Sequence, residues 1–311
     1  MATKVLITGS CGFLCSNLVI YALQETDWNM VSIDKLTWAG SLLNVPQVRR
    51  HKLYLGDLCD EHLVQKILEV EQPEVVIHGA TESCIDRGAN FIKTNVGGTN
   101  NILQAALECK SVKRVLNLST CEVYGNLATG SATEGSVLNP RNPYASSKAA
   151  ADLIGQSYFN TYGLPVITIR CADNFGPRQN PSKLIPKVVY QATRNEQVQV
   201  FGAGKQTRDW IYVKDSFNAI KLLVERGQPG EVYNISAGQT HTNLEVISSV
   251  LKTLNKPESL LEFAPGIDCR YSADATKLNT LGWKPQYSFD EALQHTIGWL
   301  GANGSWFWRA K

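Results

Sequence analysis

Short apolar runs alternate with longer helical patterns through the first half of the chain. Six of these runs have the character of strands, at residues 4–7, 30–33, 52–55, 75–77, 114–118 and 165–169. Strands that alternate with helices in this way predict a parallel sheet with helices on both faces. The pattern therefore predicts an α/β fold of the Rossmann type, a doubly wound parallel sheet.

The residues that follow the predicted strands have a common place in such a fold. Parallel crossovers are right-handed and bring the carboxyl ends of the strands to one edge of the sheet. A shared ligand cleft is therefore expected at that edge, lined by Gly9, Asp34, Asp57, Ala80, Ser119 and Arg170.

The pattern loosens after about residue 174. Segments punctuated by Pro and Gly follow, at 176–178, 202–204 and 265–266, with helices such as 184–194 between them. We expect a sheet domain over residues 1–173 and, over 174–311, a smaller C-terminal substrate lobe, some segments of which return to the sheet.

Composition and charge exclude several classes of protein. The 311 residues are 43% hydrophobic and 19% charged, which is enough to bury a substantial core. The formal net charge of +2, without a long basic run, argues against a nucleic-acid partner. No run of about 18 apolar residues predicts a membrane span, and the start of the sequence lacks the pattern of a signal peptide.

The eight cysteines are scattered and form no CxxC pair. We therefore expect free thiols in a reducing, cytoplasmic compartment. Cys11 and Cys15 are interpreted as small residues beside a turn, and no metal site is predicted, because neither a histidine nor a second cysteine pair is near them in the sequence.

A glycine turn follows the first strand and opens a helix, in the run Thr8-Gly9-Ser10-Cys11-Gly12-Phe13-Leu14-Cys15. This arrangement aims free backbone N–H groups at a pyrophosphate. The spacing is Gly-x-x-Gly-x-x-Cys, and Cys15 stands where a third glycine would let helix and strand pack closely. A looser contact is expected there.

Asp34, at the end of the second strand, strengthens the prediction of a dinucleotide site. A carboxylate there accepts hydrogen bonds from both ribose hydroxyls and repels a 2′-phosphate, so NAD is favoured over NADP. Lys35 either softens that preference or is solvated. Asp57, after the third strand, either meets the adenine end or caps the next helix.

Candidate catalytic groups lie in two further runs. Tyr144 and Lys148 are one helical turn apart, so the lysine charge can lower the pKa of the tyrosine and make its phenolate a base. The run Ser119-Thr120-Cys121-Glu122 adds hydroxyl, thiol and carboxylate groups. Such a set can oxidise a sugar and then act on its neighbouring carbons.

With these residues the chain resembles the extended short-chain dehydrogenase/reductases, and within them the nucleotide-sugar 4,6-dehydratases of the dTDP-glucose type. The resemblance extends over nearly the whole chain and is strongest at residues 34–40, 81–87, 174–177, 183–186 and 207–210. It implies an NAD-dependent enzyme that binds its cofactor in the sheet domain and a nucleotide-diphosphate sugar mainly in the smaller lobe.

The resemblance also implies roles for single residues. Tyr144 takes the proton of the sugar 4-hydroxyl while hydride passes from C4 to NAD, with Lys148 holding the ribose and Thr120 bonded to the same hydroxyl. Glu122 then removes the acidified C5 proton and water leaves from C6. Hydride returned to C6 gives a 4-keto-6-deoxy sugar.

Cys121 departs from the family pattern, in which an aspartate protonates the departing 6-hydroxyl. A protonated thiol is a poorer acid and a weaker hydrogen-bond donor than a carboxylic acid. The Cys-Glu pair also resembles that of UDP-GlcNAc 5,6-dehydratases, which return hydride to C4 and leave an exocyclic enol ether. An epimerase, a decarboxylase and a non-catalytic NAD-binding protein remain further alternatives.

The resemblance implies the remaining site residues. The cofactor would contact Gly9, Cys11, Gly12, Phe13, Leu14, Asp34, Lys35, Asp57, Leu58, Ala80, Asn95, Tyr144 and Lys148. The substrate would contact Ser83, Thr120, Asn174, Lys183, Leu184, Arg208, Asn234 and Arg270. Departures at Gly79, Thr81, Cys84 and Cys269 bear on substrate choice. A homodimer is expected through helices around residues 91–108 and 144–162.

Overall fold

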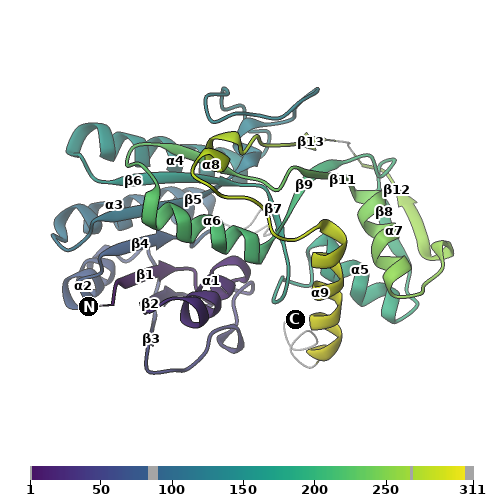
Figure 1. Cartoon of the computed structure of the whole chain (residues 1–311), viewed down its shortest axis with the longest axis horizontal. Helices are drawn as coiled ribbons and strands as arrows, with labels where there is room; N and C mark the ends of the chain where they lie inside the picture. The colour runs from purple at the N-terminus through teal and green to yellow at the C-terminus, as the bar shows by residue number, and fades with distance from the viewer. Residues whose placement is uncertain (1, 83–89, 267–268, 305–311) are drawn as a thin grey trace.

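The computed structural model describes residues 2–82, 90–266 and 269–304. Its larger part is built on a seven-stranded parallel sheet in the order β10-β6-β5-β4-β1-β2-β3 (Figure 1). These strands are β1 (Lys4–Thr8), β2 (Asn29–Asp34), β3 (His51–Leu55), β4 (Val75–His78), β5 (Arg114–Thr120), β6 (Val166–Cys171) and β10 (Val232–Ile235). The predicted Rossmann-type sheet is confirmed, and all six predicted strands form.

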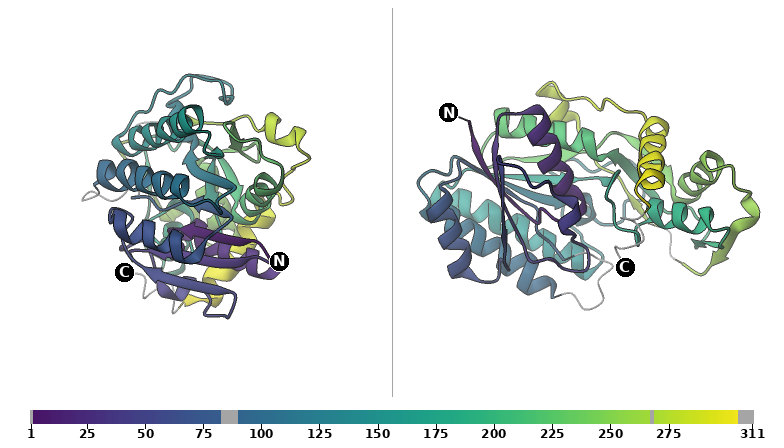
Figure 2. Two further views of the ribbon diagram at one scale, coloured as in Figure 1. Left: turned by 90° about the vertical axis from the view of Figure 1, so that its left-hand side faces the viewer. Right: turned by 90° about the horizontal axis from the view of Figure 1, so that it is seen from below.

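Helices cover both faces of this sheet (Figure 2). One face packs on α1 (Phe13–Glu25) and α6 (Val213–Arg226). The other packs on α2 (Glu61–Glu71), α3 (Gly98–Glu108) and α4 (Pro143–Tyr162). Successive side chains of β1 point to opposite faces of the sheet. Val5 and Ile7 pack in the core of the first face, and Leu6 packs in the core of the second.

β10 comes from the later half of the chain and pairs with β6 at the edge of the sheet. Its four residues, Val-Tyr-Asn-Ile, carry the fully buried polar side chain of Asn234, so they lack the apolar run that marks the other strands.

A smaller lobe lies at the carboxyl edge of the sheet, on the right of Figure 1. It contains α5 (Leu184–Thr193), α7 (Asn243–Thr253) and α9 (Phe289–Ala302), with its own core around Phe175, Ile185 and Val246. Its strands are β7 (Asp173–Phe175), β9 (Thr207–Tyr212), β11 (Gln239–Thr242) and β13 (Arg270–Tyr271) in one sheet, and β8 (Val198–Phe201) with β12 (Leu261–Ala264) in another. The short α8 (Thr276–Thr280) packs near β10.

Short side chains set the starts of several helices. Asn142 caps α4 by accepting from the N–H of Ala145, with Pro143 in the first turn, and the helix ends at Gly163 in a left-handed conformation. Capping boxes begin α7 at Thr242 and α9 at Ser288. No helix among the described residues has the length and apolarity needed to cross a membrane.

Candidate active site

A cavity of about 500 Å³ opens at the carboxyl edge of the parallel sheet and reaches into the smaller lobe. The predicted edge residues Gly9, Asp34, Asp57, Ala80 and Ser119 line it. The sixth, Arg170, does not. Its guanidinium is buried and forms an ion pair with Asp152, with 2.9 Å between Nε and Oδ2, so it stabilises the protein interior and the expectation for Arg170 was wrong.

The glycine turn after β1 forms the wall of the cavity below α1. Gly9 has φ +74°, and a Cβ there would lie 2.7 Å from the Cα of Ala80, so this position requires glycine. Gly12 precedes α1 and offers no side chain to accept the first N–H groups of the helix. With Phe13 and Leu14 at the lining, this helix start suits a pyrophosphate.

Cys15 packs closely against the sheet, contrary to the looser contact expected for a cysteine in place of glycine. Its side chain is 3% exposed. The space for it comes from Gly79, because a Cβ added to Gly79 would lie 2.3 Å from the Cys15 sulfur. The unusual cysteine on α1 and the unusual glycine after β4 therefore compensate each other.

Asp34 is buried at the cavity wall, and burial raises its pKa. Its Oδ2 accepts from the N–H of Cys11 at 2.8 Å and its Oδ1 from the N–H of Leu36 at 2.7 Å. A carboxylate oxygen has two lone pairs, so each oxygen can still accept from a ribose hydroxyl. Cys11 acts here through its backbone, since its fully buried side chain does not line the cavity.

Lys35 is partly exposed at the cavity, and its charge is compensated by two carboxylates. Its Nζ lies 2.6 Å from Glu82 Oε1 and 3.7 Å from Asp57 Oδ2. Asp57 lines the cavity beside Leu58, and the cap of α2 is Asp60, so the alternative of a capping role for Asp57 was wrong.

Asn95 lies behind the cavity wall and does not line it. It belongs to the π-helical turn η2 (Ile92–Gly97) and is almost fully buried. Its Oδ1 accepts from the N–H of Glu82 at 2.8 Å, and its Nδ2 donates to Ser147 Oγ at 2.9 Å. Asn95 therefore connects the segment after β4 to α4. Ser83 and Cys84 lie outside the described residues.

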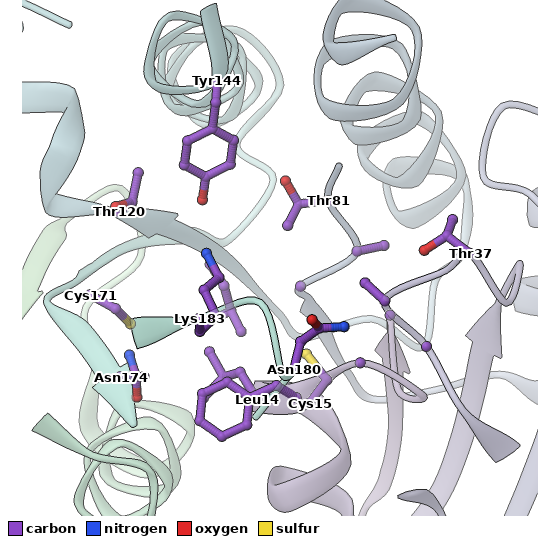
Figure 3. A pocket seen from close by; sticks show the side chains of 18 of the residues that line it. Leu14, Cys15, Thr37, Thr81, Thr120, Tyr144, Cys171, Asn174, Asn180 and Lys183 are labelled. Carbon is purple, nitrogen blue, oxygen red and sulfur yellow. The ribbon is translucent and has the colours of Figure 1, made fainter. Parts of the chain in front are cut away.

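The Tyr-Lys pair projects from the first turns of α4, and both residues line the cavity. Figure 3 shows the Tyr144 hydroxyl pointing into the cavity, between the side chains of Thr120 and Thr81. Lys148 is buried and donates to the carbonyl of Leu118 at 2.7 Å, and burial lowers its pKa. A lysine held this way places a positive charge beneath the cavity floor.

Thr120 and Glu122 line the cavity at the end of β5, where the short helix η3 (Cys121–Tyr124) begins. Thr120 Oγ1 accepts from the N–H of Glu122, and Glu122 Oε2 accepts from Asn142 Nδ2 at 3.0 Å. Burial raises the pKa of Glu122, and the charge of Asp173 raises it further. Such a carboxylate suits a base that works near neutral pH.

Cys121 does not line the cavity, although it stands between two residues that do. Its side chain is 3% exposed and belongs to the core under the sheet. Burial, followed by the charges of Asp173 and Glu122, raises the pKa of the thiol well above its ordinary value. The structure thus gives no support to Cys121 as a proton donor to a ligand.

The smaller lobe contributes Asn174, Lys183, Leu184 and Arg208 to the lining. In Figure 3, Lys183 extends into the space below Tyr144, and Asn174 lies beside it. The guanidinium of Arg208 stacks over Tyr271, with its central carbon 4.7 Å from the ring centroid. Two basic groups at this end suit a diphosphate.

Two predicted substrate residues do not line this cavity. Asn234 is fully buried, accepts from the Tyr124 hydroxyl at 2.7 Å and donates to the carbonyl of Ala132 at 3.0 Å. Arg270 turns outward, and its guanidinium donates to the carbonyl of Gly130 at 3.2 Å. Both stabilise the strands around β13, so neither expectation is supported.

Sequence reasoning missed several lining residues whose buried polar atoms have no hydrogen-bond partner in the described part of the chain. These atoms are Asp173 Oδ2, Gln179 Oε1, Trp210 Nε1 and Asn243 Oδ1, and Arg208 Nη1 is in the same state. Buried polar groups are normally satisfied, so these atoms indicate where a polar ligand binds. The rule on strand ends could have indicated Asp173, because it comes two residues after the end of β6.

No group of His, Cys, Asp or Glu among the described residues could hold a metal ion. A dinucleotide fits the cavity better, since the helix start, the Asp34 carboxylate and the unsatisfied polar atoms follow one another along its wall.

Comparison with known proteins agrees with this geometry. The GDP-mannose 4,6 dehydratase family matches residues 6–296. The low-salt glycan biosynthesis protein Agl12 of Haloferax volcanii is 42% identical, over 94% of this chain and 97% of that protein. The dTDP-glucose 4,6-dehydratase of Xanthomonas campestris is 37% identical, over 97% and 94%.

Among solved structures, the dTDP-glucose 4,6-dehydratase of Bacillus anthracis in complex with NAD superimposes with a TM-score of 0.95. It is 36% identical, and the match covers 100% of both chains. The resemblance expected from the sequence is confirmed: the chain belongs to the GDP-mannose 4,6 dehydratase family, the nucleotide-sugar dehydratases of the extended short-chain dehydrogenase/reductases.

Proposed function

We propose that the protein is an NAD-dependent hydro-lyase that converts an NDP-hexose of the dTDP-glucose type to its 4-keto-6-deoxy sugar. The proposal rests on one cavity. Along its wall lie an acidic site for the ribose, a Tyr-Lys pair, a buried glutamate and, in the smaller lobe, two basic side chains. Family membership and the dTDP-glucose 4,6-dehydratases among the relatives support the same reaction.

The cofactor end is formed by the helix start at Gly12 and by Asp34. The N–H groups of the first turn of α1 bind the pyrophosphate, and Asp34 accepts from the adenosine ribose. When bound, NAD supplies a hydride acceptor for C4 of the sugar and returns the hydride at C6. The ion pairs of Lys35 with Asp57 and Glu82 make this lysine a poor partner for a 2′-phosphate.

Tyr144 takes the proton of the 4-hydroxyl, and Thr120 holds that hydroxyl in place. The buried charge of Lys148 stabilises the phenolate that accepts the proton. Glu122 then removes the C5 proton, which the neighbouring C4 carbonyl has acidified. Its raised pKa makes it a stronger base than an ordinary carboxylate.

Lys183 and Arg208 bind the diphosphate from the smaller lobe. The Arg208 guanidinium is held against Tyr271, and its Nη1 has no acceptor among the described residues, so it can donate to a phosphate oxygen. Trp210 Nε1 and Asn243 Oδ1 offer one further donor and one acceptor to the ligand.

The test is product analysis after incubation with dTDP-glucose, UDP-glucose and UDP-GlcNAc in deuterated water. Loss of water with one deuteron retained at C5 supports the 4,6-dehydration. Water loss without a carbon-bound deuteron would replace it with the 5,6-dehydration. Unchanged sugars, in the presence of bound NAD, would overturn both reactions.

We also propose a cytoplasmic homodimer that packs through α3, α4 and η2. Ile92, Leu153 and Tyr162 expose large apolar side chains there, at 69%, 56% and 60%. All described cysteines are free thiols, which supports a reducing compartment. Leu153→Glu should convert a dimer to a monomer in sedimentation experiments, and a wild-type protein that sediments as a monomer would contradict the proposal.

A further inference from the structure

Elimination of water from C5 and C6 needs two groups, one to take the C5 proton and one to protonate the departing 6-hydroxyl. Four carboxylates line the described part of the cavity: Asp34, Asp57, Glu122 and Asp173. Asp34 is the last residue of β2 and Asp57 comes shortly after β3, both at the cofactor end. Only Glu122 and Asp173 lie where the Tyr-Lys pair meets the smaller lobe.

Asp173 begins β7, the strand that leads from the parallel sheet into the smaller lobe. Its side chain is 33% exposed, and its Oδ2 lies 3.6 Å from Arg208 Nε. Among residues 2–82, 90–266 and 269–304, this buried Oδ2 atom accepts no hydrogen bond and Arg208 Nη1 donates none. A carboxyl oxygen and a guanidinium N–H are thus left for a polar ligand on the same wall.

Cys121 cannot protonate the departing 6-hydroxyl. Its sulfur is shut off from the cavity in the core, and burial raises the pKa of its thiol well above the ordinary value. A proton on that thiol is neither accessible to the sugar nor readily released.

Granting the proposed dehydration, we propose that Asp173 is the acid that protonates the departing 6-hydroxyl while Glu122 takes the C5 proton. The step begins with both carboxylates ionised, and Asp173 first receives the proton that Tyr144 has removed from the 4-hydroxyl. The C5–H electron pair forms the C5–C6 double bond, the C6–O bond breaks, and the leaving oxygen takes the Asp173 proton to become water. Glu122 later returns its proton to C5, so both carboxylates end the cycle ionised, as they began it.

The two carboxyl groups line the same part of the cavity and influence each other electrostatically. The charge of Asp173 is second only to burial in raising the pKa of Glu122, and it also raises that of Cys121.

The test uses the leaving group, because fluoride departs without the full proton transfer that hydroxide requires. Asp173→Asn should lower turnover of the nucleotide sugar about 100-fold. The variant should accumulate enzyme-bound NADH, since oxidation at C4 precedes the impaired step. With the 6-deoxy-6-fluoro analogue of the same sugar, its turnover should return to within about tenfold of wild type, which also shows that it is folded.

Two matched variants make the result specific. Glu122→Gln removes the base, so it should be slow on both sugars. Cys121→Ala should remain within about tenfold of wild type on the natural sugar. The proposal is overturned if Asp173→Asn is as fast as wild type, if fluorine fails to rescue it, or if Cys121→Ala shows the fluorine-dependent rescue. If wild type itself forms no product, the proposed function fails, and the role of Asp173 with it.

Discussion

At the scale of single residues, the chemistry depends on how the environment of Glu122 sets its protonation. Burial and the charge of Asp173 both raise its pKa. A base must be ionised, so activity should fall as the pH falls through this raised pKa. Asp173→Asn removes a negative charge, which lowers the pKa of Glu122 and should move the acidic limb of kcat/KM to lower pH.

The measurement is a pH profile of kcat/KM with the 6-fluoro sugar, on which the variant keeps its activity. Asp57→Asn is the matched control, because Asp57 lines the cavity at the cofactor end and is paired with Lys35. That control should leave the limb in place. An identical limb in wild type and Asp173→Asn would contradict the coupling of the two carboxyl groups.

At the scale of elements, the packing of α1 on the sheet depends on Cys15 and Gly79. The Cβ introduced by Gly79→Ala would lie 2.3 Å from the Cys15 sulfur. We expect this overpacking to reduce the free energy of unfolding by about 1–3 kcal/mol. Cys15→Ala removes the sulfur, so the double variant should recover much of that loss. Urea unfolding of the wild type, the two single variants and the double variant gives the interaction energy between the two positions.

Gly298→Ala is a suitable control for that cycle. Gly298 lies within α9, and a Cβ there meets nothing within 4 Å. Alanine is favoured over glycine in a helix, so this substitution should increase the free energy of unfolding by about 0.5–1 kcal/mol. Additive effects of Gly79→Ala and Cys15→Ala would show that the two residues do not compete for one space.

The same contact shows what the sequence could and could not predict. Strands and the glycine turn were predictable because apolar runs and glycine spacing are local signals. The pairing of Cys15 with Gly79 was not, because it joins positions 64 residues apart in the chain. Cys15 alone therefore indicated a loose contact, and only the fold revealed the compensation.

The candidate site divides in the same way. Gly9, Asp34, Tyr144 and Lys148 carry spacing signals and all line the cavity. Polar residues without such signals were harder to place, because Asn95, Asn234 and Arg270 form hydrogen bonds with other protein groups. A residue type shows which bonds a side chain can make, while the fold decides whether its partner is protein or ligand.

At the scale of the whole molecule, Asp209 joins the two parts that enclose the cavity. Its buried carboxylate accepts from Ser236 Oγ at 3.1 Å, just after β10 of the parallel sheet. It also accepts from Ser272 Oγ at 2.8 Å and the N–H of Ala273 at 2.9 Å, just after β13 of the lobe. One buried anion thus holds the lobe's strands against the edge of the larger sheet.

Stability of the whole molecule should depend on pH through His78, which is buried under the cofactor wall. Thr99 Oγ1 donates to the carbonyl of Asn95, so it accepts from His78 Nε2 at 2.9 Å. Thr8 Oγ1 accepts from the N–H groups of Gly79 and Ala80 and donates to His78 Nδ1 at 2.8 Å. The imidazole is therefore neutral in the folded protein.

Burial, followed by the charge of Lys148, lowers the pKa of His78 to about 3. In the unfolded chain the pKa of this group returns to about 6.5, so below that pH the unfolded state binds one more proton than the folded state. The free energy of unfolding should therefore fall with falling pH, by about 1.4 kcal/mol per pH unit between roughly pH 5.5 and pH 3.5.

Urea unfolding at a series of pH values measures this slope. His78→Asn removes the titrating group, so its slope should be shallower than that of wild type by about one proton, even if the variant is less stable at every pH. His62→Gln changes an exposed histidine on α2 and should keep the wild-type slope. Equal slopes for His78→Asn and wild type would mean that His78 takes up its proton in the folded protein. In that case the hydrogen-bond chain from Asn95 to Gly79 would not hold the imidazole neutral.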